Sequence, residues 1–160
     1  MQPKTDKNLA AFLDMIAVSE LGRPLLAKSD NGYNVIVGST AGAPKLFHSY
    51  ADHPRQIIEI RPGLKSTAAG RYQLLARYFD VYKRQLGLQD FSPASQDAIA
   101  VQQIRERSAL ADIQGGRLAA AIAKCKNIWA SLPGAGYGQN EHSLAYLQAA
   151  YVSAGGFVAA

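Results

Sequence analysis

Residues 7–24, KNLAAFLDMIAVSELGRP, determine how the fold begins. Apolar side chains recur along this stretch at the spacing of one helical face, and they are Leu9, Phe12, Leu13, Ile16 and Ala17. This spacing predicts an amphipathic helix over residues Lys7–Leu21. Gly22 and Pro24 follow at once, and both residue types commonly end helices. The fold is therefore expected to open with one helix that turns its apolar face to the core.

Glu20 is an unusual residue for the end of this helix. At about 100° per residue, it returns to within about 20° of the face that carries Leu9, so it extends the apolar stripe. The negative end of the helix dipole also disfavours an ionised carboxylate in the last turn. Burial and dipole both raise a carboxyl pKa, and a carboxyl protonated near neutral pH can cleave a glycosidic bond as an acid. The alternative is a frayed helix end with Glu20 in water.

After Gly22 the sequence period changes. The β-rich stretches 33–37 and 46–50 flank the loop-forming stretch GSTAGAPK, which predicts a hairpin with a long loop. Residues Gln56–Ile60 are expected to add a third short strand. A helical pattern then returns at Gly70 and continues to the end of the chain.

The later helices are bounded by recognisable signals. Ser92 and Pro93 are typical of an N-cap followed by the first helical position. Gly115-Gly116 separates this helix from the next one, whose apolar stripe includes the sole cysteine, Cys125. A last helix is expected over residues 141–153, packed through Leu144, Leu147 and Tyr151. The order of helix, small sheet and four or five helices indicates an α+β fold, in which the hairpin can form one wall of a cleft.

Length and composition limit the class of protein. A chain of 160 residues with 48% apolar content is expected to form a single domain over residues 1–160, with a core of about residues 7–156 and without a separate binding domain. No apolar run is long enough for a membrane span, and the polar N-terminus lacks the apolar centre of a signal peptide. One cysteine excludes an internal disulfide.

The net charge of +5 predicts attraction to polyanions such as nucleic acids, anionic membranes and bacterial envelope polymers. The basic residues are dispersed along the chain, which disfavours a nucleic-acid-binding module. His48, Asp52, His53 and His142 do not have a recognisable zinc spacing, and a turn role is expected for Asp52-His53-Pro54. Neither a metal nor another cofactor is expected.

Six segments of the chain resemble the lambda-type endolysins of bacteriophages. They follow one another between Ala10 and Gly156, and they are AFLDMIAVSE, NGYNVIVG, YADHPR, KSTAAGRYQLL, KRQLGLQDFSPASQDAIAVQQIRER and NIWASLPGAGYGQNEHSL. The resemblance implies a lysozyme-like fold and a lytic transglycosylase that cuts peptidoglycan between N-acetylmuramic acid (MurNAc) and N-acetylglucosamine (GlcNAc). It also implies that Glu20 is the catalytic acid, because Glu20 matches the catalytic glutamate of the family.

In that family one carboxylate performs both proton transfers, and the product ends in 1,6-anhydro-MurNAc. Water is not consumed, so the second carboxylate of ordinary glycosidases is not needed. Asn34 occupies a position at which close relatives carry aspartate, and an amide cannot ionise. A single-carboxylate reaction tolerates this change. The alternatives are a hydrolytic muramidase with a second carboxylate such as Asp52, and a wall-binding protein without activity.

The remaining site residues are expected to bind the glycan. The set comprises Asn34, Ser66, Thr67, Tyr72, Gln73, Tyr137 and Gln139. Tyr72 and Gln73 are expected to begin the helix that packs beside Glu20, while the glycine-rich stretch around Tyr137 allows close approach of a sugar. Trp129 is expected in the core.

The expected partner is the peptidoglycan glycan strand, with neither nucleic-acid binding nor stable membrane insertion. The resemblance also implies a monomer that stays in the host cytoplasm until a separate holin-like protein opens a path to the periplasm and the wall.

Overall fold

The computed structural model describes residues 3–136 and 141–160. The chain divides into two compact units: unit 1 contains Met1–Glu20 and Ala100–Ala160, and unit 2 contains Leu21–Ile99. The helices and strands, in chain order, are α1 (Pro3–Leu21), α2 (Arg23–Ala27), β1 (Ile58–Arg61), β2 (Leu64–Ser66), α3 (Ala76–Leu86), α4 (Pro93–Glu106), α5 (Leu110–Gln114), α6 (Leu118–Cys125) and α7 (Leu144–Ser153). The expected α+β class is confirmed: the fold is mainly helical with a small antiparallel sheet.

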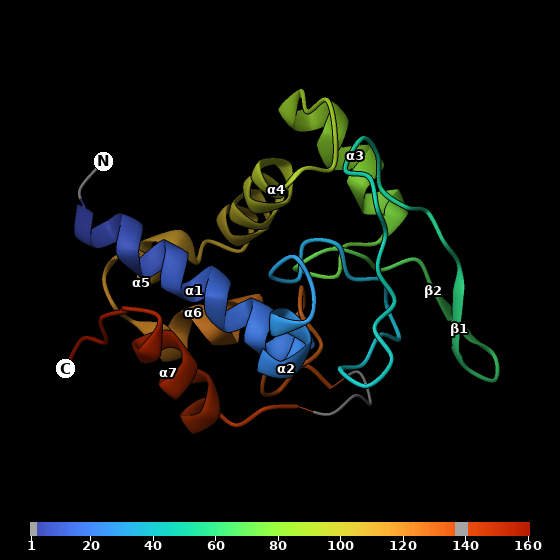
Figure 1. Ribbon diagram of the computed structural model, residues 1–160. Coiled ribbons are helices and arrows are strands. Elements are labelled where there is room, and N and C mark those ends of the chain that lie inside the picture. The colour runs from blue at the N-terminus through green and yellow to red at the C-terminus, as the bar shows by residue number, and fades with distance from the viewer. Residues whose placement is uncertain (1–2, 137–140) are drawn as a thin grey trace. The chain divides into compact units, whose positions relative to one another are not determined.

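In unit 1, α1 is the central packing element, and α5, α6 and α7 lie beside it (Figure 1). The helix begins at Pro3, four residues before the expected start, and ends at Leu21 as expected. Its end is set by Gly22, whose φ of 81° leaves the helical region. Phe12 and Ile16 are fully buried, which confirms the apolar stripe.

The C-terminal helices depart from the expected layout at two places. The helix that begins at Pro93 ends at Glu106, and a separate α5 precedes Gly115. The break occurs where Ser108 adopts a φ of 56°, a conformation that its sequence does not signal. Helix α7 begins at Leu144 rather than residue 141, because the Ser143 hydroxyl accepts a hydrogen bond from the backbone N–H of Tyr146.

The cores of the later elements follow the predicted stripes, with one exception. Cys125 and Trp129 are buried, as expected. In α7, Leu147 and Tyr151 are buried, but Leu144 keeps 41% of its surface exposed and does not pack as predicted.

In unit 2 the prediction of a hairpin formed by residues 33–37 and 46–50 is wrong. These stretches form a single isolated bridge between Val35 and Leu46. Among the described residues the only strands are β1 and β2, which pair antiparallel around a turn at Gly63. Strand β1 confirms the short strand expected at Gln56–Ile60. The wrong assignment arose because the β-rich pattern reflects burial of Val35 and Ile36, while the backbone makes only isolated bridges, including one from Ile36 to Ala69, rather than a regular ladder.

The expectation that a helix opens at Gly70 is also wrong. Ala69 and Leu74 exchange two backbone hydrogen bonds of 3.1 and 2.9 Å, which enclose a tight turn. Gly70 and Gln73 have φ values of 85° and 52°, so they cannot belong to a helix. Helix α3 starts only at Ala76.

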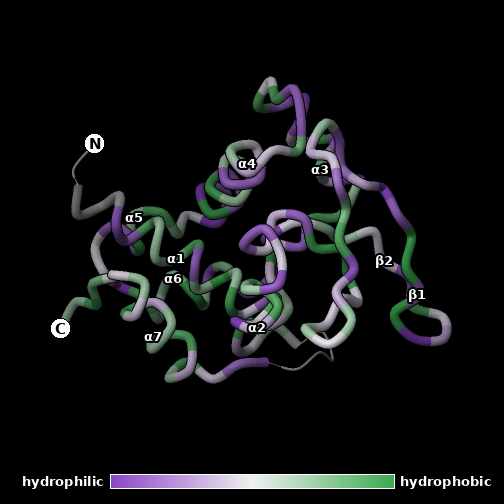
Figure 2. The backbone as a smooth tube through the Cα atoms, viewed as in Figure 1, coloured by the Kyte–Doolittle hydropathy of each residue, from purple (hydrophilic) through white to green (hydrophobic). Residues whose placement is uncertain are grey.

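The core of unit 2 is a cluster of buried residues: Ile36, Phe47, Ala69, Leu74, Phe79, Phe91 and Ile99. Helix α4 starts as predicted, since the Ser92 hydroxyl accepts the Ser95 N–H at 3.3 Å. The β1–β2 hairpin alternates between hydrophobic and hydrophilic residues (Figure 2), and Ile60 and Leu64 remain exposed. Across the described part of the chain, no helix combines the length and apolar character that crossing a membrane requires.

Candidate active site

Glu20 lies in the last turn of α1, and its carboxyl is bound by one residue from a distant part of unit 1. The hydroxyl of Ser131 donates to Glu20 Oε2, and the Ser131 backbone also hydrogen-bonds the carboxyl. The two residues are 111 positions apart in the chain. Glu20 therefore does not lie at a frayed helix end, and its carboxyl has a defined protein partner.

The environment of Glu20 favours the protonated form. Burial raises the pKa of Glu20 to about 7, against the lowering effect of the hydrogen bonds from Ser131. The sequence predicted this direction from burial together with the helix dipole, and burial is the dominant cause. A carboxyl with this pKa can hold a proton near neutral pH and can also release it.

A second layer of contacts surrounds this pair. Ser19 and Ser131 are both buried, and their hydroxyl oxygens lie 2.7 Å apart. His142 hydrogen-bonds the backbone carbonyls of both serines. Its ring Nε2 donates to Ser19 O at 3.0 Å, and its backbone N–H donates to Ser131 O at 2.9 Å. The imidazole also stacks on Tyr146 with ring centroids 4.6 Å apart. The sequence did not predict these contacts, since Ser131, His142 and Tyr146 lie more than 100 residues from Glu20 in the chain.

Two of the expected glycan-binding residues, Ser66 and Thr67, lie at and just after the end of β2 in unit 2. The Ser66 hydroxyl accepts the Ala68 N–H at 3.1 Å. The Thr67 hydroxyl accepts the N–H of Ala76, the first residue of α3, at 3.0 Å. Both residues are partly exposed. Thr67 therefore stabilises the start of α3.

Tyr72 and Gln73 make contacts inside unit 2. Tyr72 is buried, and its hydroxyl donates to Asp97 at 2.6 Å while accepting from Arg71 at 3.0 Å. Tyr33 donates to the same carboxylate at 2.9 Å. Gln73 donates through Nε2 to Gly70 O at 2.8 Å and so closes the tight turn. These side chains hold the turn in shape.

Asn34 belongs to a short loop of unit 2. Its Oδ1 accepts the Asp30 N–H at 2.9 Å, and the side chain keeps part of its surface exposed. Asp30 in turn accepts the Tyr50 hydroxyl at 2.6 Å. Asn34 thus uses its neutral side-chain amide for a hydrogen bond to the loop backbone.

Tyr137 and Gln139 lie outside the described residues. The residue that follows this gap is Glu141, which accepts backbone N–H groups of Gly134 and Gly136 at 2.9 and 3.0 Å. These bonds lower the pKa of the Glu141 carboxyl. The glycines that precede the gap are therefore tied to the residue that follows it.

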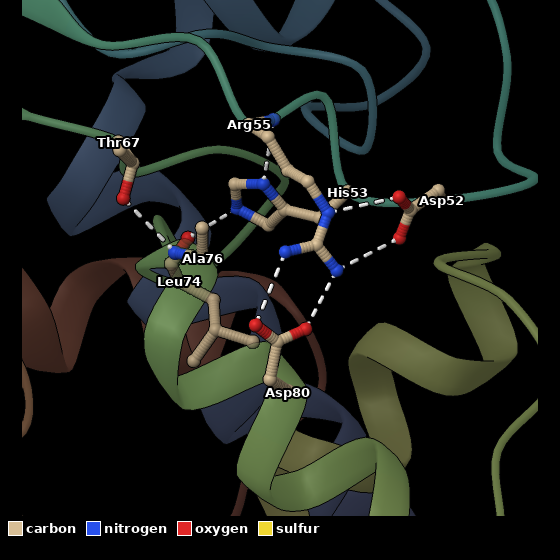
Figure 3. A network of polar contacts seen from close by, with 7 residues as sticks. All are labelled: Asp52, His53, Arg55, Thr67, Leu74, Ala76 and Asp80. Carbon is tan, nitrogen blue, oxygen red and sulfur yellow. Dashed lines mark hydrogen bonds and ion pairs between the residues drawn. The ribbon is translucent and has the colours of Figure 1, made fainter.

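His53 and Asp52 take part in the network of Figure 3. His53 is buried, with Nε2 donating to Leu74 O at 2.8 Å and Nδ1 accepting the Arg55 N–H at 3.0 Å. Burial lowers the pKa of His53, which keeps the ring neutral. Arg55 bridges the carboxylates of Asp52 and Asp80 at 2.9 and 2.6 Å. The described residues hold no group of three or more metal-ligating side chains.

Comparisons with known proteins agree with this architecture. A model of the Endolysin family matches residues 10–158. The endolysin of Escherichia phage lambda is 56% identical over 149 residues, which are 92% of this chain and 91% of that protein. The endolysin of Escherichia phage P2 is 53% identical over 159 residues, with 95% of each chain covered.

Two solved structures share the fold. Bacteriophage lambda lysozyme complexed with a chitohexasaccharide superposes with a TM-score of 0.88 at 53% identity, covering 96% of this chain and 97% of that one. A second structure of lysozyme from bacteriophage lambda has a TM-score of 0.80 at 52% identity, with the same coverage. The fold is thus that of the phage lysozymes. The chain belongs to the endolysin family of cell-wall-degrading enzymes.

Proposed function

We propose that this endolysin is a lytic transglycosylase that cleaves the β-1,4 bond between MurNAc and GlcNAc in peptidoglycan. The observation that carries the proposal is the Glu20 carboxyl, which is held by Ser131 and has a pKa of about 7. One group with that pKa can supply a proton and later accept one. A reaction in which the same carboxyl donates a proton and later takes one back needs no second carboxylate.

The reaction proceeds in two proton transfers. Glu20 first protonates the glycosidic oxygen, and the bond from that oxygen to MurNAc C1 breaks with both electrons leaving on oxygen. The resulting carboxylate then takes the proton of the MurNAc C6 hydroxyl, whose oxygen bonds to C1. The products are a free GlcNAc hydroxyl end and a 1,6-anhydro-MurNAc end, and the enzyme regains its starting protonation state.

The glycan strand is the proposed substrate because lambda lysozyme has been solved in complex with a chitohexasaccharide. We assign direct sugar contacts to Asn34 and Ser66, which are partly exposed. Thr67, Tyr72 and Gln73 would act by holding the turn and the start of α3 through the bonds described above. Tyr137 and Gln139 complete the proposed set from their positions in the sequence.

Product mass tests the reaction type. Digestion of purified peptidoglycan should release anhydro products, which are one water lighter than the reducing ends formed by a hydrolase. Glu20→Gln should abolish release while the protein stays folded and still binds wall fragments. Asp52→Asn serves as the matched control, because Asp52 is paired with Arg55 and has no role in the single-carboxylate reaction. Reducing ends alone, together with loss of activity in Asp52→Asn, would establish a hydrolytic muramidase instead.

The cellular setting follows from the proposed reaction. The wall lies outside the cytoplasmic membrane, so we propose that a separate holin-like protein admits the enzyme from the host cytoplasm. The net charge of +5 would then help the enzyme, acting as a monomer, to stay on the anionic envelope.

A further inference from the structure

We infer that Ser131 is a positioning residue for Glu20: its hydroxyl, paired with the hydroxyl of Ser19, holds the Glu20 carboxyl in place in both of its protonation states. This inference rests on the proposed acid and base roles of Glu20. It adds a function for a residue that does not touch the reacting bond itself.

The geometry places Ser131 between two neighbouring residues of α1. Consecutive side chains on a helix point in directions about 100° apart, so Ser19 and Glu20 do not face each other directly. Ser131 contacts both, with its Oγ bonded to Glu20 Oε2 and 2.7 Å from Ser19 Oγ. Ser131 and Ser19 are each at most 6% exposed, so water competes little for these hydroxyls.

A hydroxyl partner suits a carboxyl that changes its charge. An arginine or lysine can only donate and would hold Glu20 ionised, as Arg55 does for Asp52. The Ser131 hydroxyl can donate to the carboxylate, and it can accept from the carboxylic acid if it donates to Ser19 instead. The pair of serines can therefore hydrogen-bond Glu20 in both states, with Ser19 donating to Ser131 when Glu20 is ionised and Ser131 donating to Ser19 when Glu20 is protonated.

The fold holds both serines through one residue. His142 donates to the backbone carbonyls of both Ser19 and Ser131. It therefore links the segment containing Ser131 to the last turn of α1. His142 is a titratable group among the described residues that contact this pair. The causes of the Glu20 pKa shift are burial and Ser131, and a charged side chain is not among them.

The test replaces the hydroxyl and follows Glu20 directly. Ser131→Ala removes the hydroxyl but keeps the backbone bond, and Ser131→Thr keeps both. Ser95→Ala is the matched control, because Ser95 is also a buried serine that donates to a carboxylate, that of Asp90 at 2.8 Å. Each variant is assayed for kcat and KM on purified peptidoglycan across pH. Carbon-13 NMR of labelled glutamate gives the Glu20 titration separately from that of His142, with Glu20→Gln assigning its signal among the four glutamates.

In Ser131→Ala we expect kcat to fall by about 10- to 100-fold near pH 7 with little change in KM, because a misplaced catalytic group costs rate. The Ser131 hydrogen bond lowers the Glu20 pKa, so its loss should move the NMR titration and the alkaline limb of kcat/KM to higher pH. Ser131→Thr should recover most of the rate, and Ser95→Ala should keep both profiles.

A purely structural role would change the melting temperature of Ser131→Ala but leave kcat and the Glu20 titration of the folded fraction as in the parent, and that result overturns the inference. If Ser131→Ala fails to fold, Ser19→Ala answers the same question, since it removes the hydroxyl that pairs with Ser131. Failure of the proposed function is distinct, because Glu20→Gln would then retain activity.

Discussion

Protonation of Glu20, the proposed catalytic acid, is linked to the stability of the folded chain. The folded chain holds this proton up to a pH of about 7, whereas an exposed glutamate loses it near 4.5. Since the folded state binds the proton more tightly, the stability that depends on Glu20 is fully present below about pH 4.5. It declines as the pH rises from about 4.5 to about 7 and is lost above that range.

Replacing Glu20 by glutamine should therefore stabilise the protein under alkaline conditions. We expect Glu20→Gln to raise the free energy of unfolding at pH 8 by about 1–3 kcal/mol, since an amide has no charge to bury. At pH 4 the two proteins should be close in stability. Urea denaturation at both pH values measures the difference, with Glu59→Gln, an exposed glutamate, as the control. A gain of the same size at both pH values would contradict this linkage.

Helix boundaries show how far local sequence signals reach. Ser92 and Gly22 act at the positions that their residue types predict, because a cap or a helix end depends on neighbours within a few residues. The break at Ser108 was missed, since a serine with positive φ has no local signature. The tight turn of residues 69–74 was missed because the apolar spacing of the sequence resembles that of a helix. In the folded chain, two backbone hydrogen bonds hold these residues in a turn instead.

The N-cap of α7 gives a testable prediction at the scale of a single helix. Ser143→Ala removes the acceptor for the Tyr146 N–H, which should cost about 1 kcal/mol and loosen the first turn of the helix. Hydrogen exchange of the α7 amides is the appropriate measurement, because it reports local opening. Ser153→Ala, at the other end of the same helix, should leave exchange near the parent level. Equal protection in the two variants would show that Ser143 does not hold the helix end.

At the scale of the whole molecule, stability depends on side chains that join distant segments. In unit 2 the carboxylate of Asp97 accepts hydrogen bonds from Tyr33 and Tyr72, which are 64 and 25 residues away in the chain. Arg71 reaches the Tyr72 hydroxyl and also donates to Asn31 O at 3.0 Å. This network links three stretches that share no regular sheet.

Removing the shared acceptor should weaken the unit as a whole. We expect Asp97→Ala to lower the free energy of unfolding by about 2–3 kcal/mol, because both tyrosine hydroxyls lose this acceptor and Tyr72 is buried. Denaturation followed by circular dichroism measures the loss. Glu59→Ala removes an exposed carboxylate and should stay within about 0.5 kcal/mol of the parent. A similar small effect for Asp97→Ala would mean that the core alone holds these stretches.

The sequence by itself determined the first helix and its end, the α+β class and the selection of Glu20 as the candidate catalytic acid. These conclusions rest on periodicity, on helix-ending residues and on long motifs, all of which are local or linear properties of the chain. The tertiary structure alone decided which groups surround Glu20. Ser131 reaches Glu20, and His142 reaches the backbone of the neighbouring Ser19, from more than 100 residues away. Burial, which sets the pKa of Glu20, arises only when distant segments pack together.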